Sequence, residues 1–193
     1  MISTMMQNEI DIAAKRYNLP RQLIAGIILT ESGGDLYAYK TEPAYRYLVD
    51  ITTGRPFRSL TPAEIASETA PADFPHLTIS SRDTEWWGQQ ASWGPMQVMG
   101  AVARELGYLQ PFPALCSLAY GIDIGCHHLA TLRDRFLNRY GWRGVAASYN
   151  AGIPREVTPG VFTNQEYVDR VARNHGFEAL SVSEKISAFY FRK

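Results

Sequence analysis

Helical periodicity and helix-boundary residues run through most of this chain, and they constrain its fold more than any other feature. Thr61 followed by Pro62 is typical of a helix N-terminus, and Pro20 opens another helix. Strand signals gather in 45–57, where β-branched and aromatic residues flank a TTG turn and predict a small hairpin. The sequence therefore predicts a mainly α fold. The expected helices are 4–17, 20–32, 61–68, 95–107, 114–139, 142–150, 164–174 and 181–190.

The length of the chain favours one domain. Its 193 residues, 46% of them hydrophobic, suffice for one well-packed core and are few for two. Between about 40 and 90 the chain contains five prolines, and its character differs from the helical segments on either side. We expect a single domain spanning 1–193, with 40–90 as an inserted arm that holds the hairpin.

Charge and hydropathy argue against several classes of partner. Basic and acidic residues number 19 each, so bulk charge does not favour nucleic acid. No run approaches the roughly 18 apolar residues that a membrane-spanning helix needs. The segment MISTMMQNEIDIAAKRYNLP lacks the basic cluster and apolar core of a signal peptide. We therefore expect no membrane span, and we expect export to depend on other machinery.

The cysteines and two neighbouring histidines do not indicate a disulfide or a metal site. On one continuous helix, Cys116 and Cys126 would lie about 15 Å apart, beyond the reach of a disulfide, so both are expected to be buried free thiols. His127 and His128 point in different directions on a helix, and no second ligand cluster accompanies them. The sequence therefore predicts structural histidines, no metal and no cofactor.

The stretch LIAGIILTESGG, residues 23–34, places a glutamate at the end of an apolar helix. At about 100° per residue, the leucine and isoleucines of 23–28 cover one arc, and Glu31 falls on that arc. An apolar setting disfavours a charged carboxylate and is expected to raise the pKa of Glu31. Gly33 and Gly34 would let the chain turn away while leaving space beside the carboxyl.

Three further stretches follow in order: ASWGPMQVM at 91–99, AASYNAG at 146–152 and QEYVDRV at 165–171. Singly, each is explained by a helix cap or a turn. Together with TESGG at 30–34, they resemble the lysozyme-like family-1 lytic transglycosylases, the soluble-lytic-transglycosylase (SLT) type of peptidoglycan-cleaving domain. The resemblance covers roughly 5–40 and 90–175.

The chain departs from the pattern of that family in three places. Pro95 replaces the usual leucine of a GLMQ motif, and Ser148 precedes the YN pair. Glu31 and Gly94 are 63 positions apart (94 − 31), much farther than in the simplest members. The inserted arm is therefore expected to shape one wall of the substrate groove.

The resemblance implies a goose-type, SLT-like helical fold and a specific reaction. Glu31 would protonate the MurNAc-β-1,4-GlcNAc oxygen and then, as a base, take the proton of the sugar's own 6-hydroxyl. A 1,6-anhydro ring closes on the muramic acid, with its N-acetyl group stabilising the cation in between. No second carboxylate and no water are needed, and the partners are peptidoglycan glycan strands.

The same resemblance implies a set of substrate-binding residues. Met96 would pack against a sugar face, and Gln97 would offer its amide for hydrogen bonds. Tyr149 and Asn150 match the family's YN pair across from the acid. Tyr167 matches a late tyrosine that contacts the acid or the substrate.

Ser32 and the tryptophans of EWWGQQASW complete the candidates. Ser32 follows the catalytic glutamate, although a helix cap explains it equally well. Trp86, Trp87 and Trp93 have rings that can stack on sugars, although tryptophans more often belong to a core. Of the three, Trp93 is counted among the substrate-binding residues.

Two alternatives stay open. A goose-type lysozyme would hydrolyse the same bond and needs a second carboxylate, about 6.5–9.5 Å from the acid in an inverting arrangement. Asp35, Asp83 and Glu85 are the candidates for it. In a non-catalytic wall-binding or virion structural module, Glu31 would be dispensable. We expect action on the periplasmic cell wall, with a phage lysis, virion or secretion-machinery partner as the route to it.

Overall fold

The computed structural model describes residues 2–174, 176 and 177. These residues form a mainly α fold in two compact units, one made of the described residues up to Gly34 and from Gly125 onward and the other of Asp35–Ile124. The second unit takes in the whole segment that was expected as an insertion. None of the described helices is long and apolar enough to cross a membrane. The predicted helix 181–190 lies outside the described residues.

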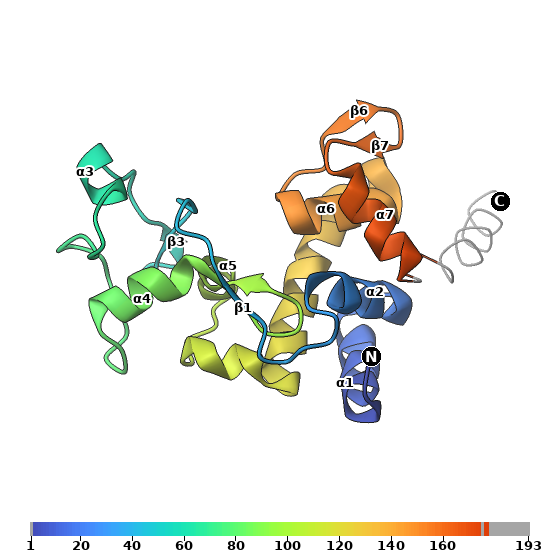
Figure 1. The fold of residues 1–193 in the computed structure, drawn as a ribbon, viewed down its shortest axis with the longest axis horizontal. Helices are drawn as coiled ribbons and strands as arrows, with labels where there is room; N and C mark the ends of the chain where they lie inside the picture. Colours follow the sequence, from blue (N-terminus) through green and yellow to red (C-terminus); the bar gives the residue numbers. More distant parts are fainter. Residues whose placement is uncertain (1, 175, 178–193) are drawn as a thin grey trace. The chain divides into compact units, whose positions relative to one another are not determined.

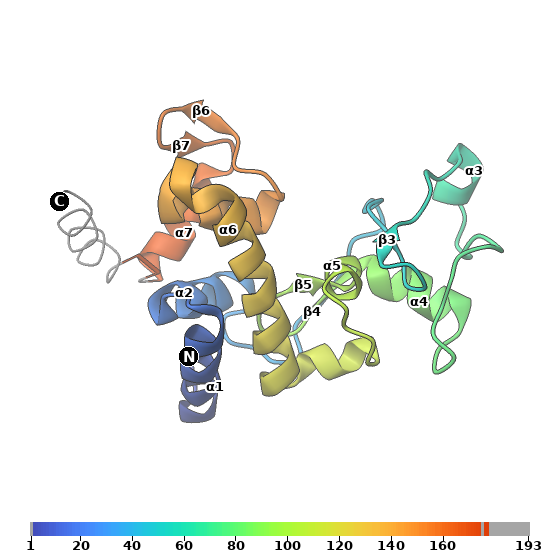
Figure 2. The same cartoon turned by 180° about the vertical axis from the view of Figure 1, so that it is seen from behind.

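Three short helices and most of a long one build the first unit. They are α1 (Thr4–Tyr17), α2 (Arg21–Glu31), α7 (Gln165–Arg173) and the part of α6 (Leu118–Ala151) from Gly125 onward. Figures 1 and 2 show α2 between α1 and α7. All four apolar residues on the predicted arc of α2 are fully buried, as the periodicity predicted. They are Leu23, Ile24, Ile27 and Ile28.

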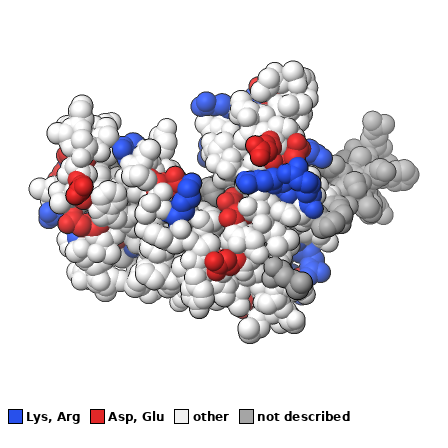
Figure 3. Space-filling model, in the orientation of Figure 1, with Lys and Arg blue, Asp and Glu red and all other residues white. Residues whose placement is uncertain are grey.

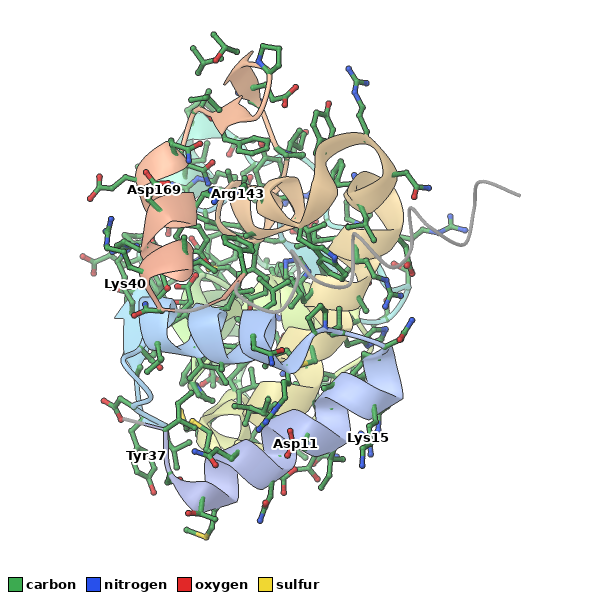
Figure 4. The ribbon with its side chains drawn as sticks, turned by 90° about the vertical axis from the view of Figure 1, so that its right-hand side faces the viewer. Asp11, Lys15, Tyr37, Lys40, Arg143 and Asp169 are labelled. Atoms are coloured by element: carbon green, nitrogen blue, oxygen red, sulfur yellow. The ribbon has the colours of Figure 1, made fainter. Side chains whose placement is uncertain are left out.

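A glycine brings the C-terminal end of α7 close to α2. A Cβ on Gly26 would lie 2.7 Å from the Cα of Gly176 and 3.3 Å from the carbonyl oxygen of Val171, so a larger residue does not fit. Asn174 Nδ2 donates to Thr30 Oγ1 at 2.9 Å. The last turn of α2 is thereby tied to the C-terminal end of α7. Figure 4 shows α2 between α7, which carries the labelled Asp169, and α1, which carries the labelled Asp11 and Lys15.

The long helix α6 contains the break that the sequence predicted between 139 and 142. Gly141 has φ 61° and ψ −173°, a conformation that favours glycine and interrupts the helical path. Beyond α6, strands β6 (Glu156–Thr158) and β7 (Val161–Phe162) form a hairpin that was not predicted.

The second unit is built on small antiparallel sheets and short helices. Strands β1 (Tyr39–Thr41), β4 (Ala91–Trp93) and β5 (Val98–Met99) form a three-stranded sheet in the order β1-β4-β5. Strands β2 (Val49–Asp50) and β3 (Arg55–Pro56) form the hairpin predicted within 45–57. The helices are α3 (Pro62–Ile65), α4 (Arg82–Gln89), α5 (Gly100–Glu105) and the 3₁₀ helix η1 (Phe112–Cys116).

This unit has an apolar core and a buried ion pair. Leu48, Phe74 and Trp86 pack together and are nearly inaccessible to solvent. Glu85 and Arg104 are also buried, and Arg104 Nε and Nη2 donate to the two carboxylate oxygens at 2.8 and 3.0 Å. The bidentate geometry compensates both charges within the interior.

Several predicted helix boundaries were wrong. The helix expected over 95–107 is a turn, then β5, then α5, because residues 98–99 pair with β4. The helix expected at 61–68 spans one turn, capped by Thr61 as predicted. The helix α4, capped by the Ser81 hydroxyl, was missed.

The expectation of one helix carrying both cysteines was also wrong. Ser117 is extended, with φ −86° and ψ 153°, and it separates η1 from α6. Cys126 is a buried free thiol as predicted, whereas Cys116 is free but partly exposed.

Charged side chains of both signs are interspersed on the surface. Figure 3 shows acidic and basic residues near one another on the drawn face of each unit, among larger uncharged areas. This distribution agrees with the balanced composition, which does not favour a partner recognised through bulk charge.

Candidate active site

The helix α2 ends abruptly at the candidate acid. The Ser32 hydroxyl donates to the carbonyl of Ile28 at 3.1 Å and accepts from the Gly34 N–H at 3.1 Å. Gly33 and Gly34 follow with φ of 65° and 88°, a region in which a Cβ is unfavourable. Ser32 therefore terminates the helix, and the chain turns away just after Glu31.

The carboxyl of Glu31 meets a tyrosine from α7. Tyr167 is 4% exposed, and its hydroxyl donates to Glu31 Oε1 at 2.6 Å, across 136 positions of sequence. Burial and the negative charge of Glu31 raise the pKa of Tyr167 well above its ordinary value. The phenol therefore stays protonated and remains a donor.

Tyr149, near the end of α6, belongs to the same site. Burial, followed by the charge of Glu31, raises the pKa of its phenol well above the ordinary value. The Glu31 carboxylate is thus close enough for its negative charge to disfavour ionisation of the Tyr149 phenol. The ring of His128 lies 5.3 Å from that of Tyr149, and burial lowers the pKa of His128 to about 4. A neutral imidazole therefore packs beside the phenol at neutral pH.

A residue missed in the sequence analysis holds Asn150. Asn164 Nδ2 donates at 2.9 Å to Asn150 Oδ1 and also at 2.9 Å to the carbonyl of Ala147. Asn164 is the N-cap of α7, but its side chain makes no capping bond because α6 engages it. An asparagine just before the segment QEYVDRV indicates a helix cap. The actual partners of its side chain lie 14 and 17 residues away in the sequence, so no local signal predicts this role.

Three helices thus bring together five of the eight predicted site residues in the first unit. The other three belong to the second unit. The joined residues are Glu31, Ser32, Tyr149, Asn150 and Tyr167, and the others are Trp93, Met96 and Gln97.

The GPMQ segment has a structural role within the second unit. Gln97 Nε2 donates to the carbonyls of Ala38 and Gly94 at 2.9 Å each, and its Oε1 accepts from Ser92 at 3.0 Å. A Cβ on Gly94 would lie 2.1 Å from the carbonyl oxygen of Leu115. Both N–H groups of the Gln97 amide therefore already donate within the chain, and a role of Gln97 toward sugar stays a prediction.

Met96 differs from expectation, whereas the tryptophans divide between the core and a half-buried setting. Met96 is fully buried, so the expected contact of its side chain with a sugar face does not agree with the structure. Trp86 is 2% exposed and belongs to the core. Trp93 is half-buried, stacked on Phe112 with the ring centroids 5.8 Å apart. Its ring is held in place by the protein itself.

A mainly α fold with a glutamate at a helix end, held by a tyrosine from a second helix, suits the general acid of a glycan-cleaving enzyme. A family model described as Transglycosylase SLT domain matches residues 8–158. The match covers more than half of the chain. The chain therefore belongs to the SLT-domain family, which consists of lysozyme-like peptidoglycan lytic transglycosylases. Comparison with curated proteins and with solved structures found no match. Tyr167 lies beyond the matched residues.

Proposed function

We propose that this protein cleaves the MurNAc-β-1,4-GlcNAc bond without water and leaves 1,6-anhydromuramyl ends, with Glu31 as acid and then base. The observation that carries the proposal is the 2.6 Å hydrogen bond from Tyr167 to Glu31 at the end of an apolar helix. This bond holds the carboxyl in a fixed orientation, and its charge also acts on a second phenol, that of Tyr149. Such a group can give up a proton and recover one without leaving its position.

The reaction balances without a co-substrate. Protonated Glu31 gives its proton to the glycosidic oxygen as the bond to C1 of the muramic acid breaks. The Glu31 carboxylate then takes the proton of the 6-hydroxyl, and the 6-oxygen forms the new bond to C1. The acid is regenerated, and the donated hydrogen bond of Tyr167 supports the carboxylate between the two steps.

The hydrolytic alternative needs a second carboxylate that can hold a water. Glu85 is poorly suited to that role, because it is fully buried and both of its oxygens accept from Arg104. Asp35 accepts from the N–H of Tyr37, and Asp83 accepts from the N–H of Ala70. The first bond organises a local turn, and the second joins α4 to the loop that contains Ala70, 13 positions away.

Replacing Tyr167 by phenylalanine tests the hydrogen bond to the acid. A donated hydrogen bond favours the charged carboxylate, so its loss should move the alkaline limb of the pH–rate profile to higher pH. The lost orientation should lower kcat/KM by about tenfold at the optimum. Initial rates on purified peptidoglycan across pH measure both effects.

Tyr37→Phe is the matched control, because Tyr37 is 78% exposed and loses the same hydroxyl. It should change neither the rate nor the pH limb. An unshifted limb in Tyr167→Phe would mean that the phenol does not act on the Glu31 carboxyl.

The products test the proposed function directly. Peptidoglycan digested with the protein should release muropeptides one water lighter than those of a hydrolase, as mass spectrometry would detect. Products of full mass with reducing ends would instead assign the protein to the lysozymes. Absence of any soluble product from an intact, folded preparation would support a wall-binding module.

A further inference from the structure

We propose that the second unit carries a separate sugar-binding pocket, which takes a neutral N-acetylhexosamine segment of the glycan strand. This inference rests on the proposed function, because it assigns an additional place where the same polymer is held. The pocket has a volume of about 630 Å³ and lies wholly within residues of the second unit. That volume is in the range of small-ligand sites, roughly 300–1,000 Å³.

Aromatic rings form its walls, and the protein holds them in place. Trp87 on α4 is 37% exposed, and its indole Nε1 donates to the carbonyl of Glu68 at 3.0 Å. Tyr39 on β1 is 52% exposed, with its ring centroid 4.7 Å from that of Trp93. Trp93 stacks in turn on Phe112. Since contacts within the unit fix these rings, little order is lost when a flat ligand binds.

The pocket offers polar groups that suit sugar hydroxyls. Thr84 contributes a hydroxyl, which lies 2.8 Å from the hydroxyl of Ser81. Asp83 contributes a carboxylate, whose Oδ1 already accepts from the N–H of Ala70. A carboxylate has acceptor sites to spare beyond that bond. Aromatic faces with a few hydroxyl and carboxylate groups match a ring that has an apolar C–H face and polar edges.

The charge of the pocket favours the glycan over the peptide stems of the wall. Among the described lining residues, Arg104 is the one cation, and it is 3% exposed and paired with Glu85. Its guanidinium also lies over the ring of Phe112, 3.9 Å from the centroid. Asp83 is the one carboxylate of the lining. A stem peptide or phosphate, which brings negative charge, would meet Asp83 without an available cation.

The test measures binding without turnover, in full-length protein carrying Glu31→Gln. The probe is peptidoglycan glycan freed of its stem peptides, and a soluble stem tetrapeptide is the competitor. Adding Trp87→Ala should raise the dissociation constant for the glycan about tenfold, because one stacking face is lost. Adding Trp87→Phe should keep it within about threefold, since the face remains.

Two results would overturn the proposal. One is an unchanged dissociation constant in Trp87→Ala, with a melting curve like that of the parent. The other is displacement of the glycan by the tetrapeptide. If Trp87→Ala does not fold, Asp83→Asn is measured instead, and unchanged glycan affinity in that variant also counts against the pocket. Because no cleavage is involved, these results are independent of which products the wild type releases.

Discussion

Glu31→Gln is expected to lower the rate of peptidoglycan cleavage by about 1,000-fold, while the protein stays folded. Acid and base catalysis each contribute on the order of 10²- to 10⁴-fold, and both roles fall on this one carboxyl. Glutamine has the same size, and its amide oxygen can still accept the bond from Tyr167. Loss of turbidity of a peptidoglycan suspension measures the rate, and circular dichroism measures the fold.

Glu166→Gln is the matched control for this change. Glu166 is exposed on α7 beside Tyr167, and the same substitution there should leave the rate within about twofold. Full activity in Glu31→Gln would remove Glu31 from the chemistry and return the non-catalytic module as the leading explanation.

Glu85→Ala is expected to destabilise the second unit by about 3–5 kcal/mol. The substitution leaves the Arg104 guanidinium buried at 3% exposure without its bidentate partner. Gln89 also loses an acceptor, because its Nε2 donates to Glu85 Oε1 at 3.0 Å. Urea denaturation followed by tryptophan fluorescence measures the free energy of unfolding, since Trp86 and Trp87 adjoin Glu85 in sequence.

Glu42→Ala provides the comparison for that measurement. It removes the same side chain from the exposed pair that Glu42 makes with Lys40 in the same unit. An exposed ion pair contributes about 0–1 kcal/mol, so the two variants should differ clearly. Equal losses in both would mean that the Glu85–Arg104 pair is not desolvated as the structure has it.

Local signals account for the parts of the fold that were predicted well. The apolar arc of α2, the Thr61 cap and the break at Gly141 depend on neighbours within a few residues. Helix 164–174 was expected, and α7 spans Gln165–Arg173. Periodicity and caps are informative at this range because they describe one element at a time.

Most errors come from strand pairing and tertiary contacts, which helix signals do not express. The segment GPMQVM has a helix-opening proline, yet Val98 and Met99 pair with β4, and Gln97 bonds to the carbonyl of Ala38, 59 positions away. The predicted sugar contact of Met96 failed for a similar reason, because the burial of its side chain depends on tertiary packing that the motif alone does not show. Helix α4 is different, because its Ser81 cap is a local signal, although it lies in a proline-rich region that does not favour helix.

Only part of the candidate site could be predicted from the residues alone. The setting of Glu31 on an apolar arc follows from periodicity, whereas its partner Tyr167 lies 136 positions away. The order of the motifs supplied Tyr167, through the resemblance to a known family. Asn164 has no such motif, and only the folded chain shows that it holds Asn150.

The most direct measurement of the central claim is digestion of peptidoglycan in water enriched in heavy oxygen, followed by mass spectrometry of the products. Closure of the anhydro ring uses the sugar's own 6-oxygen, so the account predicts products that carry no heavy oxygen and are not formed by Glu31→Gln. One heavy oxygen at each new reducing end would contradict it, because water would then be the attacking group.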